Sequence, residues 1–448
     1  MNYQEFKQAV IAEAQARGIA DYELYYQAEE STAVSTFRHE INEFTGAMEG
    51  GLCFRCIVEG RMGYASTEAM TLSEAKRIVS AAADNALCLE TDDPVFLVEG
   101  GQTYTDPGRV AYALPSTETL IKKTLDGDAA LYAADSNVVD GSLARGYSIH
   151  SELAICNSKG LDLHCENDMT ALMVGAVVSK DGEMANDYQM KVGEFSSMDI
   201  PALCQKAVNT ALTKLGGDVP ATGTYPVVFG SEAMSDLLST FSSSFSSEAA
   251  QKGLSKLAGK EGAMVASTLV DLMDDPFHPE NPSPRPFDAE GSATYAKHLI
   301  QKGELKTLLY NLKTAAIAGK QTTGNASKGG YNSAIGVRPF TMYLAPGEET
   351  EEALLSRAGK GIFIESLAGL HAGADSVTGD FSLQSSGYLI EEGKKTNYIK
   401  SFTVAGNFFD LLQNIIGIAN NFELPMAIGP TAFGSPSVLV KELSVAGK

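Results

Sequence analysis

One short segment near the middle of the chain limits how the whole sequence can fold. Residues 216–223 read Gly-Gly-Asp-Val-Pro-Ala-Thr-Gly, so small and helix-breaking residues cluster where little could pack. Segments of this kind are typical of boundaries between separately packed domains. The sequence therefore predicts an N-terminal domain over residues 1–217, a linker over 218–223 and a C-terminal domain over 224–448.

The N-terminal half carries both helical and strand patterns. Apolar residues at helical spacing predict helices over residues 2–17, 72–86, 117–133 and 200–215. Thr71 and Glu74 have the spacing of a capping box at the start of the second of these helices. Alternating patterns predict strands near residues 23–27, 33–38, 51–58 and 63–66, and a meander of long antiparallel strands from 136 to 192.

The C-terminal half also mixes the two kinds of element. A predicted strand at 225–229 leads into a predicted helix at 231–245, and further strands are expected at 361–367, 381–390 and 397–404. Residues 274–293 contain five prolines, which predicts an exposed, extended segment. Both halves together predict an α+β fold of two domains, each with antiparallel or mixed sheets and packed helices.

The charge balance excludes several kinds of partner. The chain has 448 residues with 34 Lys and Arg against 56 Asp and Glu, which gives a formal charge of −22. A polyanion is repelled by phosphate backbones and by anionic lipid surfaces, so we expect neither direct nucleic-acid binding nor membrane binding. The sequence has no apolar run long enough to span a bilayer, and its first 20 residues lack a secretion signal, so a cytoplasmic protein is expected.

The motifs of common catalytic and metal sites are missing. Gly319 and Gly324 have the spacing of a phosphate-binding loop, but Asn325-Ala326 follow where lysine and a hydroxyl are required. The sequence contains no GxSxG nucleophile motif, and no two of its six histidines have the i, i+4 spacing of a helical metal site. Cys53 and Cys56 form a CxxC, but on a strand they point to opposite faces, so it predicts no zinc or redox site.

One histidine lies in a setting that suits chemistry. His371 belongs to a glycine-containing loop, Gly369-Leu370-His371-Ala372-Gly373, and lies close in sequence to Asp375 and Asp380. A loop histidine near carboxylates can act as a base or a ligand. It can equally be an ordinary polar group of the surface, and the sequence leaves both interpretations open.

A series of motifs in the C-terminal half, taken in order, identifies a family. These motifs are Asp274-Asp275-Pro276, Phe287-Asp288-Ala289-Glu290-Gly291, Leu299-Ile300-Gln301-Lys302-Gly303-Glu304-Leu305, Thr323-Gly324-Asn325, Gly369-Leu370-His371, Thr378-Gly379-Asp380-Phe381-Ser382, Gly387-Tyr388-Leu389-Ile390-Glu391 and Ala405-Gly406-Asn407. Their order over some two hundred residues resembles the TldD/PmbA family, and the N-terminal half agrees through the strand around residues 50–56 and the hairpin at 157–160.

The resemblance implies an α+β fold and a function in proteolysis. In that family a TldD subunit pairs with a TldE (PmbA) subunit in a cytosolic metalloprotease, and the pair encloses the active site so that only unfolded polypeptide enters. The TldD subunit carries an HExxxH helix and a later cysteine around the metal, which activates a water molecule. The family is also often labelled a modulator of DNA gyrase, and the charge of −22 argues against direct contact with DNA.

This chain departs from the TldD pattern at the metal. The corresponding helix reads Ser239-Thr240-Phe241-Ser242-Ser243-Ser244, and no cysteine follows Cys204. Hydroxyls are poor substitutes for imidazole on a divalent metal, so we expect no metal or catalytic residue in this chain, and zinc only in a TldD-like partner. The resemblance then implies a PmbA/TldE-like subunit. The alternative is a stand-alone homodimeric peptide-binding protein without protease activity.

Two glycine-rich loops are the expected cleft-facing or partner-facing elements. They contain Gly324 and Asn325 in residues 319–330, and His371, Gly373, Gly379 and Asp380 in residues 368–380. Glycine lets a peptide backbone approach closely, which suits contact with an unfolded peptide or with the partner, either a TldD-like subunit or a second copy. Ordinary hairpin geometry explains such loops equally well.

Overall fold

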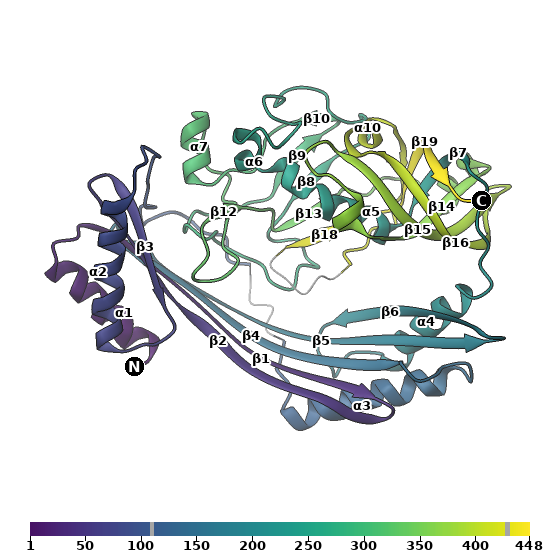
Figure 1. Ribbon diagram of the computed structural model, residues 1–448, viewed down its shortest axis with the longest axis horizontal. Coiled ribbons are helices and arrows are strands. Elements are labelled where there is room, and N and C mark those ends of the chain that lie inside the picture. Colours follow the sequence, from purple (N-terminus) through teal and green to yellow (C-terminus); the bar gives the residue numbers. More distant parts are fainter. Residues whose placement is uncertain (108–111, 426–430) are drawn as a thin grey trace.

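The computed structural model describes residues 1–107, 112–425 and 431–448. Figure 1 shows a long curved sheet with helices at both of its ends, and above it a rounder C-terminal part. This mixture of helices and mainly antiparallel sheets confirms the predicted α+β fold. No described helix has the length and apolar character that a membrane span requires.

The N-terminal part is built on one six-stranded antiparallel sheet in the order β3-β2-β1-β4-β5-β6. Its strands are β1 (Asp21–Phe37), β2 (Glu40–Val58), β3 (Arg61–Thr67), β4 (Leu143–Asn157), β5 (Asp162–Lys180) and β6 (Glu183–Val192). The hairpin at residues 157–160 is confirmed, since it joins β4 to β5, and a second hairpin turn at 181–182 joins β5 to β6. Four of these strands have 15 residues or more, so one sheet extends along most of the molecule.

Four helices cover one face of this sheet. They are α1 (Tyr3–Ala16), α2 (Leu72–Cys88), α3 (Thr117–Ala134) and α4 (Ile200–Thr213). Leu24 packs with α1 and α2, and Val34 packs with α3 and α4. Leu24 and Val34 are separated by an even number of positions on β1. Alternate residues of a strand point to the same face of the sheet, so all four helices lie on that face.

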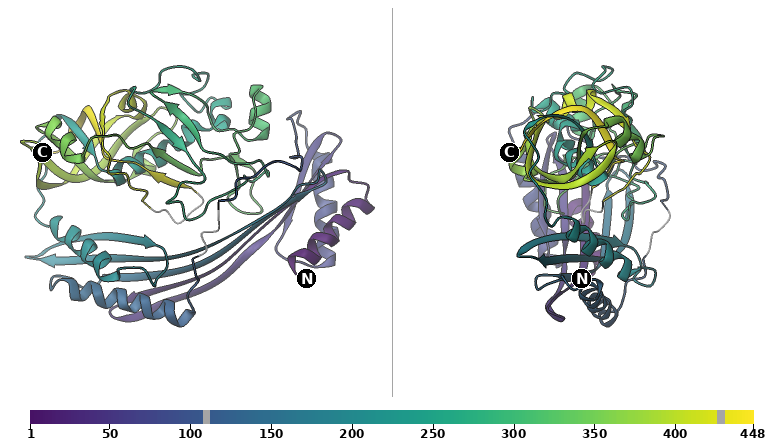
Figure 2. Two further views of the ribbon diagram at one scale, coloured as in Figure 1. Left: turned by 180° about the vertical axis from the view of Figure 1, so that it is seen from behind. Right: turned by 90° about the vertical axis from the view of Figure 1, so that its right-hand side faces the viewer.

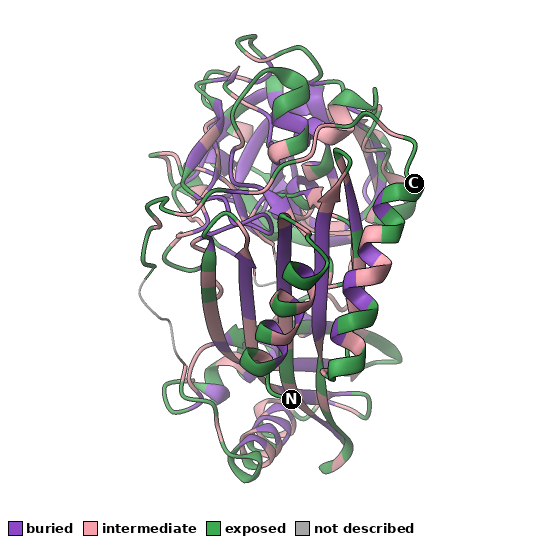
Figure 3. Ribbon diagram, turned by 90° about the vertical axis from the view of Figure 1, so that its left-hand side faces the viewer, coloured by how far each residue is buried: buried purple, intermediate pink, exposed green. Residues whose placement is uncertain are grey.

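The opposite face of the sheet packs against the C-terminal part. Tyr25 on β1 and Ile155 on β4 belong to one apolar cluster with Phe287 and Ala326. Figure 3 shows buried strands of the sheet running up to the C-terminal part. The two cysteines of the CxxC divide in the same way, because Cys53 joins this cluster while Cys56 packs under α1 and α2. The prediction that they point to opposite faces is confirmed.

The C-terminal part contains a closed ring of strands and a second sheet. The first sheet has the order β16-β15-β14-β7-β19-β17, and β16 also pairs with β19, which closes a ring that Figure 2 shows end-on. Its strands are β7 (Gly223–Phe229), β14 (Gly361–Ala368), β15 (Asp380–Glu391), β16 (Lys394–Asn407), β17 (Ile415–Ile418) and β19 (Val438–Ala446).

The second sheet is made of short strands in the order β10-β9-β8-β13-β18. Its strands are β8 (Leu272–Asp274), β9 (Lys297–Gln301), β10 (Glu304–Leu305), β13 (Thr341–Leu344) and β18 (Ala432–Gly434), and a separate pair joins β11 (Ala326–Ser327) to β12 (Gly336–Val337). The helices of this part are α5 (Ser231–Phe241), the 3-10 turn η1 (Ser242–Phe245), α6 (Ser247–Gln251), α7 (Leu312–Ala318), α8 (Glu351–Ala358), α9 (Leu370–Gly373) and α10 (Phe408–Gln413).

The proline-rich segment differs from its prediction. Residues 274–293 were expected to be exposed, yet Phe287, Asp288 and Glu290 are at most 5% exposed. The prolines do prevent central strand pairing, as expected. Residues 287–292 of the segment are buried because they lie between the sheet and the C-terminal part, where Phe287 packs against the sheet.

The linker is also more ordered than its composition indicates. Asp218 pairs with Ile399 of β16 as an isolated bridge, and its backbone N–H donates to the carbonyl of Tyr398 at 3.1 Å. A Cβ at Gly217 would lie 2.8 Å from the ring of Tyr398, so glycine permits this close approach. The linker is thus held on the ring of strands. Independent folding of the two predicted domains stays a prediction.

Candidate functional site

The helix α5 presents a polar face beside its buried one. Met234, Leu237, Leu238 and Phe241 are fully buried in the C-terminal core. Four polar residues follow one another along the chain at spacings of four, three and four residues. This spacing places them along one open side of the helix and its following turn. These residues are Glu232, Asp236, Ser239 and Ser243.

A pocket of about 500 Å³ adjoins the end of this helix. We call it the helix pocket, and its polar lining includes Ser239, Ser242, Ser243, Ser246, Lys252 and Arg338. Regular helix ends at Phe241 and continues as the 3-10 turn η1, in which Oγ of Ser242 donates to the carbonyl of Ser239 at 2.8 Å. Serines often make such bonds back to the chain, and this explains why the helix ends earlier than predicted.

The serines of this region divide into two groups. Oγ of Ser244 donates to the carbonyl of Ser376 at 2.8 Å, and Oγ of Ser247 donates to Thr314 Oγ1 at 2.8 Å, so these two hydroxyls hold neighbouring loops. Ser239 and Ser243 line the helix pocket instead, and within the described chain their hydroxyls form no hydrogen bond. They are available to a ligand in the pocket.

The residues of the helix pocket do not suit zinc. Zinc in proteins is held by thiolate, imidazole and carboxylate groups, and neutral hydroxyls bind it poorly. The open side of the helix offers serine hydroxyls at the end that borders the pocket. Across residues 1–107, 112–425 and 431–448, no three His, Cys, Asp or Glu side chains come together in a way that could hold a metal ion.

A second pocket of about 360 Å³ lies between the sheet and the C-terminal part. We call it the sheet pocket. One wall comes from the sheet, through Tyr25, Leu153 and Met169, and the other comes from the C-terminal part, through Arg285 and Phe340. Arg338, Pro339 and Thr431 line both pockets, so the two pockets adjoin, and we call them together the cleft.

Two carboxyl groups on α5 have raised pKa values, which favours their neutral form. Burial, followed by the charge of Glu232, raises the pKa of Asp236 to about 7. Burial and the charge of Asp187 raise the pKa of Glu232. A carboxyl group that titrates near neutral pH can exchange protons with a bound ligand or can donate a hydrogen bond to it. In the described residues these groups have no nucleophile as a hydrogen-bond partner, so the arrangement supports binding more directly than catalysis.

Gly324 and Asn325, which were expected to face a cleft or a partner, lie behind the cleft. Asn325 is fully buried, and its Nδ2 donates to the carbonyl of Arg338 at 3.1 Å and to Oδ2 of Asp274 at 2.7 Å. Gly324 has a φ of +68°, and a Cβ there would lie 2.5 Å from the carbonyl oxygen of Ala293. These two residues therefore fix the loop that carries Arg338 into both pockets.

The other four predicted site residues form a separate group beyond α5. His371 and Gly373 lie on α9, where His371 is exposed, and Asp380 begins β15 and accepts a hydrogen bond from Asn407 at 2.8 Å. Gly379 is buried with a φ of +82°. None of the four lines the helix pocket or the sheet pocket. The structure therefore does not bring them together with Gly324 and Asn325.

No pattern in the sequence predicts the cations that line the cleft. Arg285, Lys328 and Arg338 lie on loops, and no motif marks them. One available signal was Arg285 inside the proline-rich segment, since a basic residue among so many prolines is a plausible binding feature. The prediction of an exposed, extended segment assigns no such role to Arg285.

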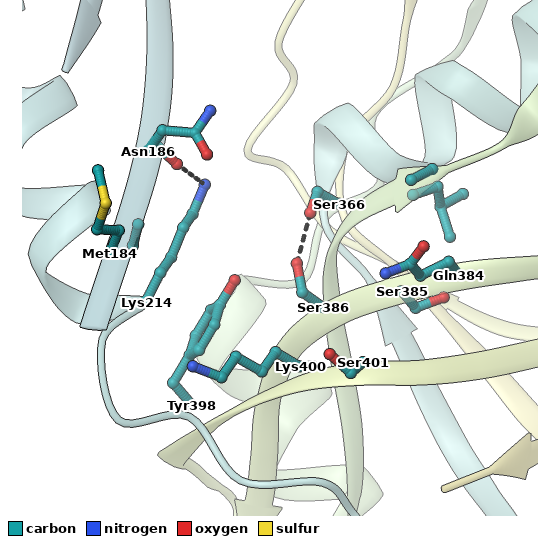
Figure 4. A pocket seen from close by; sticks show the side chains of 13 residues that line it. Met184, Asn186, Lys214, Ser366, Gln384, Ser385, Ser386, Tyr398, Lys400 and Ser401 are labelled. Atoms are coloured by element: carbon teal, nitrogen blue, oxygen red, sulfur yellow. Dashed lines mark hydrogen bonds between the residues drawn. The ribbon is translucent and has the colours of Figure 1, made fainter. Parts of the chain in front are cut away.

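A third pocket of about 220 Å³ lies where β6 meets the ring of strands (Figure 4). Lys214 points towards β6, and its Nζ bonds to the carbonyl of Asn186 at 3.4 Å and to Asp187 Oδ1 at 2.7 Å. Lys400 pairs with Glu183 at 3.3 Å. Both lysines that line this pocket already have acidic partners, and the Lys400–Glu183 pair joins the two parts of the molecule, so this pocket is a weaker candidate for ligand binding than the cleft.

The comparisons with known proteins agree with this fold along the chain. Sequence models of PmbA/TldA metallopeptidase domain 1, central domain and C-terminal domain match residues 22–86, 113–215 and 222–447. The chain therefore belongs to the PmbA/TldD family. Three segments are matched where two domains were predicted, and the third begins within the predicted linker at 218–223.

Individual relatives support the same assignment. The chain is 24% identical to a "Metalloprotease PmbA homolog" of Haemophilus influenzae over 94% of this chain and 92% of the relative. It is similar to a crystal structure of a putative modulator of a DNA gyrase from Thermotoga maritima, with a TM-score of 0.89, 28% identity and coverage of 99% and 100%. TldE from Thermococcus kodakarensis shares the fold with a TM-score of 0.87, 23% identity and coverage of 98% and 99%.

Proposed function

We propose that this chain is a PmbA/TldE-type subunit that binds no metal and holds unfolded peptide beside a TldD-type metallopeptidase subunit. The single observation that carries this proposal is the helix α5 with its following turn. Its pocket-lining end presents Ser239, Ser242 and Ser243 in place of metal-binding side chains. In this proposal zinc belongs only to the partner, and the complex is cytoplasmic.

The cleft suits the role of holding a peptide. Its two pockets share Arg338 and Pro339 in their linings, and its walls combine apolar side chains with unbonded hydroxyls. An extended peptide has apolar side chains, which need apolar contacts, and backbone amides, which need hydrogen-bond partners. Because α5 also carries the carboxyl group of Asp236, the helix can accept or donate hydrogen bonds along its open side.

A co-purification experiment with metal analysis tests this proposal. The chain is tagged in its native cell, bound proteins are identified by mass spectrometry, and zinc per chain is measured by elemental analysis. We expect a protein with an HExxxH motif to co-purify, and zinc to follow that protein. The chain isolated without it should hold far less than one zinc.

Two outcomes would contradict the proposal in different ways. One tightly held zinc per isolated chain would show that the chain has its own metal site. A homodimer that binds peptide and recruits no metallopeptidase would favour the stand-alone peptide-binding protein instead.

A further inference from the structure

Three cations line the cleft without an acidic partner. Arg285 and Lys328 line the sheet pocket, and Arg338 lines both pockets. Within the part of the chain that the structure describes, none of the three forms an ion pair with a carboxylate. Acidic residues outnumber basic ones by 56 to 34 in this chain, so three neighbouring cations without acidic partners are unexpected. Their charges are left for something outside the chain.

Two of these cations lie near the sheet. Nζ of Lys328 lies 4.6 Å from the centre of the Tyr25 ring, which is the distance of a cation–π contact. Burial raises the pKa of Tyr25 to about 12, and the nearby charge of Arg285 opposes this rise. Both cations therefore lie close to the wall that β1 contributes to the sheet pocket.

None of the three acidic residues that line the same pocket forms an ion pair with these cations in the described structure. Asp288 is buried and accepts backbone hydrogen bonds from Ala326, Glu290 and Ser292, each at 2.9 Å. Glu152 bonds to His164 at 2.9 Å. Glu29 is the third, and it lies on β1 opposite Glu49 of β2.

Apolar side chains contribute to both walls of the sheet pocket. Ile149, Leu153 and Met169 lie on the sheet side, and Phe287 and Phe340 lie on the C-terminal side. A volume of about 360 Å³ is within the usual range of small-ligand pockets. Arginine beside apolar surface is a common means of binding a carboxylate, because two of its N–H groups can bond to both oxygens.

We propose that the sheet pocket binds a carboxylate group of an extended peptide, through Arg285 and Arg338, with Lys328 adding a third positive charge. This inference rests on the proposed peptide-holding function and names the class of peptide that the cleft selects. The carboxylate has two possible sources, the C-terminal end of the peptide or an aspartate or glutamate side chain within it. Both offer the same two oxygens to an arginine.

Four fluorescent peptides of the same length test the inference in anisotropy measurements with the full chain. The first has a free C-terminus and two glutamates, the second has an amidated C-terminus, the third has glutamine in place of glutamate, and the fourth has both changes. At 150 mM salt we expect the first peptide to bind about tenfold more tightly than the fourth, as a charge-assisted hydrogen bond would give. The second and third peptides identify which source of carboxylate matters.

Variants of the chain connect this preference to the residues. The double variant Arg285→Gln, Arg338→Gln should bind the first peptide about tenfold more weakly and lose the preference over the fourth. Arg61→Gln makes the same change outside the two pockets. It should leave the affinity for the first peptide and the preference over the fourth unchanged. Arg285→Lys with Arg338→Lys keeps the charge but loses the paired N–H groups of arginine, so it should retain only part of the preference. Thermal unfolding of each variant verifies that it is folded.

The outcomes separate the two proposals. If all four peptides bind equally well to the unmodified chain, the carboxylate inference is wrong and the peptide-holding function stands. If none of them binds, both proposals fail. If the preference exists but survives in the folded glutamine double variant, the carboxylate is bound elsewhere and the inference is also overturned.

Discussion

The side-chain amide of Asn325 donates a hydrogen bond to Oδ2 of Asp274 at 2.7 Å, across 51 residues of sequence. Oδ1 of the same carboxylate accepts from the backbone of Phe340 at 2.8 Å, and Nζ of Lys297 lies 3.2 Å from Oδ2. Asp274 and Asn325 are both fully buried. This network connects β8 and β9 to the loop that carries Arg338, so it positions one wall of the cleft.

The substitution Asn325→Leu should destabilise the protein by about 2–3 kcal/mol, because it removes one donor from the buried carboxylate of Asp274 and the donor of the Arg338 carbonyl. Urea unfolding followed by circular dichroism measures the change. Asn332→Leu is the matched control, since Asn332 is exposed in the same loop and should cost less than about 0.5 kcal/mol. Equal effects of the two substitutions would contradict a structural role for Asn325.

Gly379 should tolerate alanine much less well than Gly369 does. Both have positive φ, at +82° and +77°, so both substitutions strain the backbone. Only at Gly379 would the new Cβ meet a neighbour, at 2.5 Å from the ring of Phe409, while Gly369 has nothing within 4 Å. We expect the melting temperature of Gly379→Ala to be several degrees below that of Gly369→Ala, as an added cost of about 1–3 kcal/mol implies.

The carboxyl group of Asp236 should make stability fall as pH rises. Its pKa is raised from 3.8 to about 7, so between these values the unfolded chain has lost the proton that the folded chain still holds. The unfolded state is then favoured as pH increases through this window, and the loss of folding stability is complete above about pH 7. Asp236→Asn should therefore be more stable than the unmodified chain at pH 8, by about 1 kcal/mol, and the difference should shrink towards pH 4. Chemical unfolding at a series of pH values measures this, and a difference that does not depend on pH would count against it.

His371 should be dispensable for peptide binding. It is exposed on α9 and lines neither pocket of the cleft. His371→Ala should leave peptide affinity within about twofold and unfolding free energy within about 0.5 kcal/mol, which is normal for a surface position. A larger loss of affinity in the same anisotropy measurement would restore the interpretation of His371 as a binding or catalytic group.

Local patterns in the sequence predicted most of the elements. Thr71 caps α2 as expected, because its side chain accepts the backbone N–H of Glu74. The capping box itself is incomplete, since the carboxylate of Glu74 bonds to Thr67 and Arg77 instead. The predicted helix at residues 231–245 ends as a regular helix at Phe241, since such ends depend on which neighbours are present.

The candidate site was much less predictable. Glycine content favoured the loops around Asn325 and His371, but glycine marks tight turns as often as it marks open surface. Asn325 is buried and His371 is exposed away from the cleft, so similar loop compositions led to two different environments. The cations that line the cleft come from loops that sequence alone does not place together.

The sequence by itself determined the α+β class, the faces of the strands and the family. These follow from local spacing and residue type, which act over a few positions of the chain. Only the tertiary structure decided that Phe287 is buried against Tyr25 and that Arg285 and Arg338 border one cleft. Such contacts join residues far apart in the chain, and they depend on how two large surfaces pack, which short-range patterns do not specify.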